Sequence, residues 1–207
     1  MGLSANTAVH RLGVFGGAFD PPHVAHFELA RAAIDSFELD ELRIFPTGQA
    51  WHKSRVLSAS EHRLAMAKLS FAALPQAIVD PRELERSGPT YTVDTLTELK
   101  SEYPEAELFL IMGEDQAFAL TSWHQWQEIL RLAIICVAER DDSGGDRPRF
   151  TAPQAYKSRF RRLQIPALPV SATDIRIRIA AHLSVAPLVF EPVARYIDDH
   201  HLYQTTR

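Results

Sequence analysis

Short apolar runs recur along the chain, and between them the apolar residues are spaced three or four apart. A short continuous run bounded by turn residues is typical of a buried strand, whereas the wider spacing is typical of one face of a helix. Five runs predict strands, at residues 11–15, 42–45, 77–79, 108–112 and 133–137.

Helical spacing follows the first two predicted strands. The apolar positions after the first strand are Phe27, Ala30, Ile34 and Phe37. After the second strand, Leu64, Ala67, Lys68 and Phe71 have nearly the same spacing. Strands that alternate with helices favour an α/β fold with a Rossmann-like, doubly wound parallel sheet. Residues 192–202 predict a short amphipathic helix through Val193, Tyr196 and Ile197.

The length of 207 residues, without a visible repeat or linker, predicts a single domain over 1–207. We expect its core at about 10–190 and a small C-terminal helical part at about 192–202. Two stretches interrupt the alternation, 46–57 and 139–153, and the second is typical of a mobile surface loop.

Composition narrows the class of protein. With 46% hydrophobic residues, 23% charged residues and a net charge of −4, neither a disordered chain nor a broadly basic nucleic-acid binder is indicated. The apolar runs are far shorter than the roughly 20 residues of a membrane-spanning helix. The only cysteine, Cys136, lies in an apolar run, which excludes a disulfide framework and fits a reducing cytoplasm.

The turn after the first strand reads Gly-Gly-Ala-Phe-Asp-Pro-Pro-His-Val-Ala-His over 16–26. In an open parallel sheet, ligands bind outside the carboxyl ends of the strands, so chemistry is first expected here. Gly16 and Gly17 allow the backbone to approach a ligand closely. We expect Asp20 to cap the following helix, whose first amides and positive dipole end would form an anion site.

His23 and His26 are three residues apart and therefore share one face of the first helical turn. Beside a phosphate, two imidazoles donate hydrogen bonds when neutral and gain a proton as negative charge collects. The residues alone leave three alternatives: a phosphate site, a capped helix with surface histidines, or a two-histidine metal site. The dinucleotide fingerprint Gly-x-Gly-x-x-Gly is absent, so a hydride-transfer enzyme is not indicated.

A second helix start, Ser-Ala-Thr-Asp-Ile-Arg at 171–176, lies near the other end of the chain. Ser171 and Asp174 form the pattern of a capping box. One face of this helix is lined by Ile175, Ile179 and Leu183. By itself the segment fits a well-capped helix, but the hydroxyls of Ser171 and Thr173 with the Arg176 guanidinium also suit the oxygens of a polyphosphate.

Together, the Gly-Gly-x-Phe-Asp-Pro-x-His-x-x-His turn and the Ser-x-Thr-x-x-Arg helix start resemble the nucleotidyltransferase superfamily of the HxGH type. The resemblance extends from Arg11 to Tyr203. Three further segments are similar to one member family, the bacterial nicotinate-nucleotide adenylyltransferases. They are 46–53, which ends in His-Lys, 88–96 with Gly-Pro-Thr-Tyr-Thr, and 113–124 with Gly-Glu-Asp and Ser-Trp-His.

The resemblance implies transfer of AMP from ATP to nicotinate mononucleotide, which forms nicotinate adenine dinucleotide and pyrophosphate in NAD biosynthesis. It implies that His23, His26 and Arg176 are catalytic, with the histidines on the α-phosphate. The implied ATP contacts are Gly16, Gly17, Phe19, His23, His26, Asp115, Ser171, Thr173 and Arg176. The implied contacts to the nicotinate nucleotide are Lys53, Thr92, Trp123 and His124.

Alternatives remain for some of these residues. Trp123 matches a tryptophan that stacks on the pyridine ring, or it belongs to the core. Lys53 matches a counter-charge for a substrate phosphate, or it is a solvated loop residue. Two residues depart from the family pattern: Ala25 stands where glycine is usual, and His124 stands where tyrosine is common.

The implied cofactor is Mg²⁺, held mainly by the phosphates of the substrate ATP, with no metal site built from protein ligands. ATP and nicotinate mononucleotide are the expected partners, without nucleic acid or membrane, in the cytoplasm. The pattern does not distinguish a monomer from a homo-oligomer. The alternative functions are adenylyl transfer to nicotinamide mononucleotide or another phosphate acceptor, such as phosphopantetheine, and a non-catalytic ATP-binding sensor.

Overall fold

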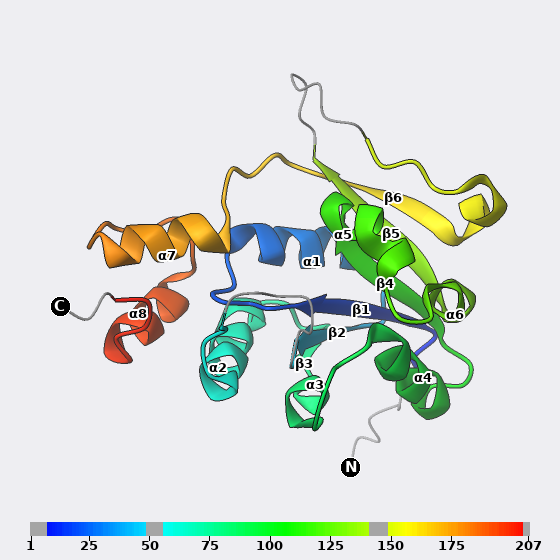
Figure 1. Cartoon of the computed structure of the whole chain (residues 1–207), viewed down its shortest axis with the longest axis horizontal. Coiled ribbons are helices and arrows are strands. Elements are labelled where there is room, and N and C mark those ends of the chain that lie inside the picture. Colours follow the sequence, from blue (N-terminus) through cyan, green and yellow to red (C-terminus); the bar gives the residue numbers. More distant parts are fainter. Residues whose placement is uncertain (1–7, 49–55, 141–148, 205–207) are drawn as a thin grey trace, which may run out of the picture.

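The computed structural model describes residues 8–48, 56–140 and 149–204. Within these ranges, six strands form one sheet in the order β3-β2-β1-β4-β5-β6 (Figure 1). They are β1 (Arg11–Gly17), β2 (Glu41–Pro46), β3 (Ala77–Val79), β4 (Glu107–Gly113), β5 (Ala133–Arg140) and β6 (Phe160–Ile165). All neighbouring strands run parallel, which confirms the predicted doubly wound α/β sheet.

Helices connect the strands and cover both faces of the sheet. They are α1 (Val24–Phe37), α2 (Ser60–Phe71), α3 (Arg82–Glu85), α4 (Thr92–Glu102), α5 (Glu114–Ala119), α6 (Trp126–Leu132), α7 (Ala172–Ala180) and α8 (Glu191–Asp199), with 3₁₀ turns η1 (Leu120–Ser122) and η2 (Gln154–Arg159). Successive side chains of a strand point to opposite faces. In β4, Phe109 and Ile111 therefore pack under α1 and α2, whereas Leu108 and Leu110 pack under α4, α5 and α6.

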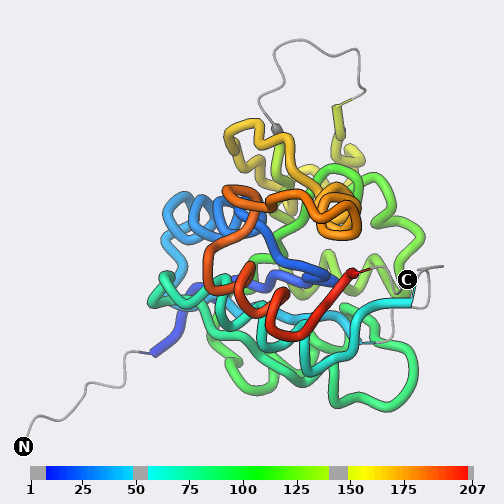
Figure 2. The backbone as a smooth tube through the Cα atoms, turned by 90° about the vertical axis from the view of Figure 1, so that its left-hand side faces the viewer, coloured from blue at the N-terminus to red at the C-terminus, as the bar shows by residue number. Residues whose placement is uncertain are grey.

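A third apolar cluster joins the C-terminal helices to α2. Met66 of α2, Ile175 of α7 and Ile197 of α8 are buried in it. Figure 2 views the molecule from this end, with α7 and α8 in front of the sheet. Ala25 packs against the same cluster, so its methyl group helps to hold the start of α1 to the C-terminal helices.

The C-terminal half differs from expectation at three places. Strand β6 was not among the predicted strands, because it is an edge strand in which only Leu163 is fully buried. Helix α7 ends at Ala180, so the prediction that Leu183 lines its apolar face is wrong, and that side chain is 55% exposed. Strand β5 continues to Arg140, into the stretch that was expected to be a loop.

Helix α2 also differs from its predicted pattern. The helical spacing expected here included Lys68, which is exposed, whereas Arg63, Met66 and Ser70 are buried. The buried face of α2 therefore includes the polar side chains of Arg63 and Ser70.

No helix in the described ranges has the length and apolar character needed to cross a membrane.

Candidate active site

The order of the strands places the predicted turns at one edge of the sheet. From β1 the chain builds β2 and β3 on one side, and then β4, β5 and β6 on the other, so the winding reverses between β1 and β4. Ligands bind at such a switch point, outside the carboxyl ends of the strands. Gly16 and Gly17 end β1 and Gly113 ends β4. Asp115 is exposed in the first turn of α5, directly beyond this edge.

The two glycines of β1 have different surroundings. Among the described residues, apart from its two chain neighbours, no atom lies within 4 Å of a Cβ placed on Gly16, which fits close approach of a ligand. A Cβ on Gly17 would lie 2.9 Å from the ring of Phe19. Phe19 is 1% exposed and packs edge-on against Phe15 and Phe71, so it supports the turn from within the core, and its contact with ATP stays a prediction.

His23 and His26 lie together at the start of α1. Their rings are stacked, with centroids 3.7 Å apart. The backbone N–H of His23 donates to Nδ1 of His26 at 3.2 Å. A neutral ring that accepts at Nδ1 carries its proton on Nε2, which is then a donor. The ring of Phe19 packs edge-on against His26 at 5.1 Å and supports it from the core side.

The prediction that Asp20 caps α1 is wrong. The helix begins at Val24 with His23 as the N-cap residue. Asp20 and Pro21 each precede a proline, which disfavours the helical conformation at both positions. The expected anion site at the first amides is also reduced, because the N–H of Val24 donates to the carbonyl of Leu188 at 3.1 Å.

Arg176 connects the two predicted anion-binding segments. Its guanidinium donates to the carbonyl oxygen of Asp20 at 2.7 Å and to Oγ1 of Thr173 at 3.0 Å. Ser171 is the N-cap of α7, and its Oγ accepts from the N–H of Asp174 at 3.1 Å, which confirms the N-cap half of the predicted capping box. The Asp174 carboxylate accepts from the Ser171 hydroxyl at 2.6 Å. The start of α7 is therefore bonded directly to the turn that carries His23.

Arg63 is a further residue of this turn that the sequence analysis did not single out. It is 4% exposed, and its guanidinium donates to the carbonyls of Ala18 at 3.1 Å, Thr47 at 2.7 Å and Ser58 at 3.0 Å. It thus ties the turn to the segment after β2 and to the segment before α2. An arginine on the buried side of a helix was the only signal in the sequence.

The residues predicted to contact the nicotinate nucleotide lie around the starts of α4 and α6. Thr92 is the first residue of α4, and Trp123 and His124 follow η1. The ring of His124 contacts that of Tyr91 at 4.4 Å, so the two segments meet through Tyr91. Trp123 is half-buried against the cluster under α4, α5 and α6, which leaves part of its ring exposed. Lys53 lies outside the described residues.

Helix α3 places a buried carboxyl group beneath the segment that leads to Thr92. Glu83 is 7% exposed, and its Oε1 accepts from the hydroxyl of Thr95 at 2.8 Å. Burial raises the pKa of Glu83 to about 7, although the Thr95 hydroxyl and the charge of Arg86 oppose the shift. The fold therefore favours the protonated carboxyl. The stability that this proton contributes is fully present below the unfolded pKa of 4.5 and is lost as the pH rises through about 7.

We expect Glu83→Gln to remove this pH dependence. The amide does not titrate, yet it keeps an oxygen that can accept from Thr95. Between about pH 5 and pH 8, the free energy of unfolding of the wild type should fall by about 3 kcal/mol relative to that of the variant. Urea unfolding of both proteins at the two pH values measures the difference, and parallel pH profiles would contradict the assignment.

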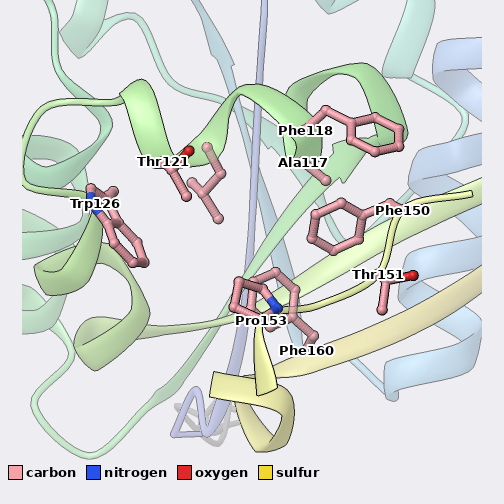
Figure 3. Close-up of a pocket in the computed structure, with 9 residues that line it drawn as sticks. Ala117, Phe118, Thr121, Trp126, Phe150, Thr151, Pro153 and Phe160 are labelled. Carbon is pink, nitrogen blue, oxygen red and sulfur yellow. The ribbon is translucent and has the colours of Figure 1, made fainter. Parts of the chain in front are cut away.

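A small apolar pocket of about 100 Å³ lies between the α5–η1–α6 segment and the chain leading into β6 (Figure 3). Its aromatic lining is Phe118, Trp126, Phe150 and Phe160. Among the described residues, no charged side chain and no predicted site residue lines it. The pocket therefore suits neither a phosphate nor a carboxylate.

A family model of cytidylyltransferase-like proteins matches residues 14–178. A parallel sheet with two such helix starts joined at its edge, together with this match, defines a nucleotidyltransferase. The probable nicotinate-nucleotide adenylyltransferase of Albidiferax ferrireducens is 69% identical over 195 residues, which cover 94% of this chain and 98% of the relative. The protein of the same description from Methylibium petroleiphilum is 40% identical, with 95% and 94% covered. The chain belongs to the nicotinate-nucleotide adenylyltransferase family.

Solved structures share the fold. The nicotinic acid mononucleotide adenylyltransferase of Plasmodium falciparum, complexed with NaAD, has a TM-score of 0.74 at 18% identity and covers 94% of this chain and 97% of that chain. A putative nicotinate-nucleotide adenylyltransferase from Vibrio parahaemolyticus has a TM-score of 0.67 at 17% identity, with 95% and 97% covered. At these identities the likeness concerns the fold alone.

Proposed function

We propose that the chain transfers AMP from ATP to nicotinate mononucleotide, forming nicotinate adenine dinucleotide and pyrophosphate. The observation that carries the proposal is the bond of 2.7 Å between the Arg176 guanidinium and the Asp20 carbonyl. It joins the polyphosphate-type helix start to the turn with the two histidines. The choice of acceptor is supported by the relative that is 69% identical.

The reaction requires alignment rather than a general base. A phosphate oxygen of the mononucleotide attacks the α-phosphorus of ATP and forms a new P–O bond. The bond from that phosphorus to the bridging oxygen breaks, and pyrophosphate leaves with the electron pair. Because the nucleophile already carries negative charge, the protein contributes mainly by holding the reactants and stabilising the charge of the transition state.

We assign His23 and His26 to the α-phosphate. The donation from the His23 N–H to Nδ1 of His26 favours an Nε2–H donor on His26. The stacked rings, 3.7 Å apart, then present neighbouring donors to the same phosphate group. Gly16 supplies the open space along the backbone that a phosphate needs, and we assign Gly17 and Phe19 to the same side of the site as the residues that shape the turn.

The leaving pyrophosphate is assigned to the start of α7. Ser171 and Thr173 supply hydroxyls, and Arg176 supplies a planar cation that matches two phosphate oxygens. Asp115, beyond the end of β4, is assigned to the ribose. Charge-assisted hydrogen bonds of this kind contribute roughly 1.5 to 3 kcal/mol each.

The nicotinate nucleotide is assigned to the region around η1 and the start of α4. The exposed part of Trp123 suits stacking on the pyridine ring. Thr92 and His124 are brought near one another through Tyr91 and are assigned to the nicotinate carboxylate, largely through backbone amides. Lys53 is assigned to the substrate phosphate.

The described residues do not form a cage for Mg²⁺. Within 8–48, 56–140 and 149–204, no group of three or more His, Cys, Asp or Glu is placed to hold a metal ion. We therefore propose that Mg²⁺ arrives on the phosphates of ATP. We further propose that the chain works as one nucleotidyltransferase domain in the cytoplasm, without nucleic acid or membrane as a partner.

Pyrophosphate release tests the function directly. The protein is incubated with ATP and Mg²⁺, and nicotinate mononucleotide, nicotinamide mononucleotide or phosphopantetheine is supplied in turn. We expect the highest kcat/KM with nicotinate mononucleotide. A higher kcat/KM with either of the other two compounds would identify that compound as the acceptor. ATP binding without pyrophosphate release in all three incubations would indicate a non-catalytic sensor.

A further inference from the structure

Asp20 is the meeting point of three segments that are distant in the sequence. Its carboxylate is 2% exposed, and Oδ2 accepts from the N–H of Ser58 at 3.2 Å. Oδ1 accepts from the hydroxyl of Tyr203 at 2.6 Å, and the main-chain oxygen accepts from Arg176. Asp20 was expected to cap α1, but it instead joins the segment before α2, the first turns of α7 and the chain that follows α8.

Tyr203 reaches this point from 183 residues away. Its φ of 62° lies in the left-handed region, where the chain bends after α8. The ring packs against the third apolar cluster, which joins α7 and α8 to α2. Burial, together with the bond to Asp20, raises the pKa of the Tyr203 hydroxyl, so that it remains a donor at neutral pH.

We propose that Tyr203 is a positioning residue for AMP transfer, acting through Asp20 on the turn that carries His23. The inference rests on the proposed function. A hydrogen bond from a phenol to a buried carboxylate is short and charge-assisted, and it fixes the direction of the carboxylate. The same residue's carbonyl holds Arg176, so a rotation of Asp20 would move the α-phosphate and pyrophosphate contacts relative to each other.

Positioning over such a distance has a measurable effect, because displacements of about 1 Å at a reacting centre cost about 10²-fold in rate. In Tyr203→Phe, the Ser58 amide and the Arg176 guanidinium still bond to Asp20, so we expect the rate to fall by less than about 10²-fold. We expect kcat to fall by about tenfold, while the KM for the mononucleotide stays within about twofold of the wild-type value.

Tyr196→Phe is the matched control. Tyr196 lies in α8, and its hydroxyl is 3.0 Å from Nδ1 of His62, away from Asp20. The change removes the same atom from the same end of the chain, but its bond is to a neighbouring ring and not to a buried carboxylate, so we expect a smaller loss of thermal stability with kcat unchanged. Equal losses of kcat in the two variants would overturn the inference.

A double-mutant cycle tests whether Tyr203 acts through Asp20. In an Asp20→Ala background, the further change Tyr203→Phe should leave kcat unchanged, because the acceptor is already gone. A second tenfold loss would contradict the inference. Should Asp20→Ala not fold, the single variants and the following measurement decide.

Hydrogen exchange provides a readout that does not depend on turnover. In the whole chain, Tyr203→Phe should increase amide exchange in the peptide that spans 16–26, whereas Tyr196→Phe should not. Unchanged exchange together with unchanged kcat would overturn the inference. Faster exchange in Tyr203→Phe, combined with a wild type that is inactive with all three acceptors, would instead refute the proposed function and leave the coupling of Tyr203 to the turn intact.

Discussion

Replacing His23 with alanine is expected to lower kcat for AMP transfer by about 10² to 10³-fold, the loss typical of one donor to a transition state. The imidazole is stacked on that of His26, and we assign it as a donor where negative charge grows during the reaction. The protein should remain folded and continue to bind ATP. Initial rates of pyrophosphate release, with ATP affinity measured by calorimetry, test both parts, and unchanged turnover would refute the role.

His23 also occupies the N-cap position of α1, so a structural effect has to be separated from a catalytic one. Asparagine is among the preferred N-cap residues, and loss of a good cap costs about 1 kcal/mol. His23→Asn should therefore restore any stability lost in His23→Ala without restoring kcat. Recovery of turnover in His23→Asn would assign the effect to the cap.

Replacing Arg176 with alanine is expected to raise the KM for ATP by about 10- to 100-fold, the range for hydrogen bonds to a charged group. The KM for nicotinate mononucleotide should change by less than about threefold, because the guanidinium is assigned to the pyrophosphate oxygens alone. Varying each substrate at saturation of the other measures the two constants. Equal increases would contradict the assignment.

Arg178→Ala is the control for Arg176→Ala. Arg178 belongs to the same helix, and its exposed side chain donates to the carbonyl of Ser184 at 2.9 Å. The substitution removes the same charge from α7 without touching the turn. We expect both KM values to stay within about twofold of the wild type, so a large rise would point to long-range electrostatics instead of a direct contact.

The sheet could be predicted from the sequence because its central strands are buried on both faces. Such strands are nearly continuous apolar runs, and all five of the predicted runs are strands in the structure, the short edge strand β3 included. Strand β6 lacks this signal because Arg161, Arg162 and Gln164 alternate with or flank the one buried residue, Leu163. The end of α7 was missed for another reason: Leu183 continued the spacing of the helix beyond the last helical residue.

The histidine pair and the cap of α7 could be predicted because each is encoded within a few consecutive residues. Asp20 had the residue type of a cap, but the two prolines that follow it delay the helix. The contacts of Arg63 and Tyr203 with the turn join segments far apart along the chain, and no local spacing signals them. The contacts of Asp20, Arg63 and Tyr203 are therefore set by tertiary packing and not by local sequence.

The two outer strands of the sheet carry a consequence for self-association. An open strand edge can template the addition of a strand from another molecule, which leads to aggregation. Here one edge is the very short β3, and the other is β6, with exposed Arg161 and Arg162. Charge repulsion and a short template both oppose edge-to-edge growth, so copies crowded together at high concentration are kept from extending one another's sheets.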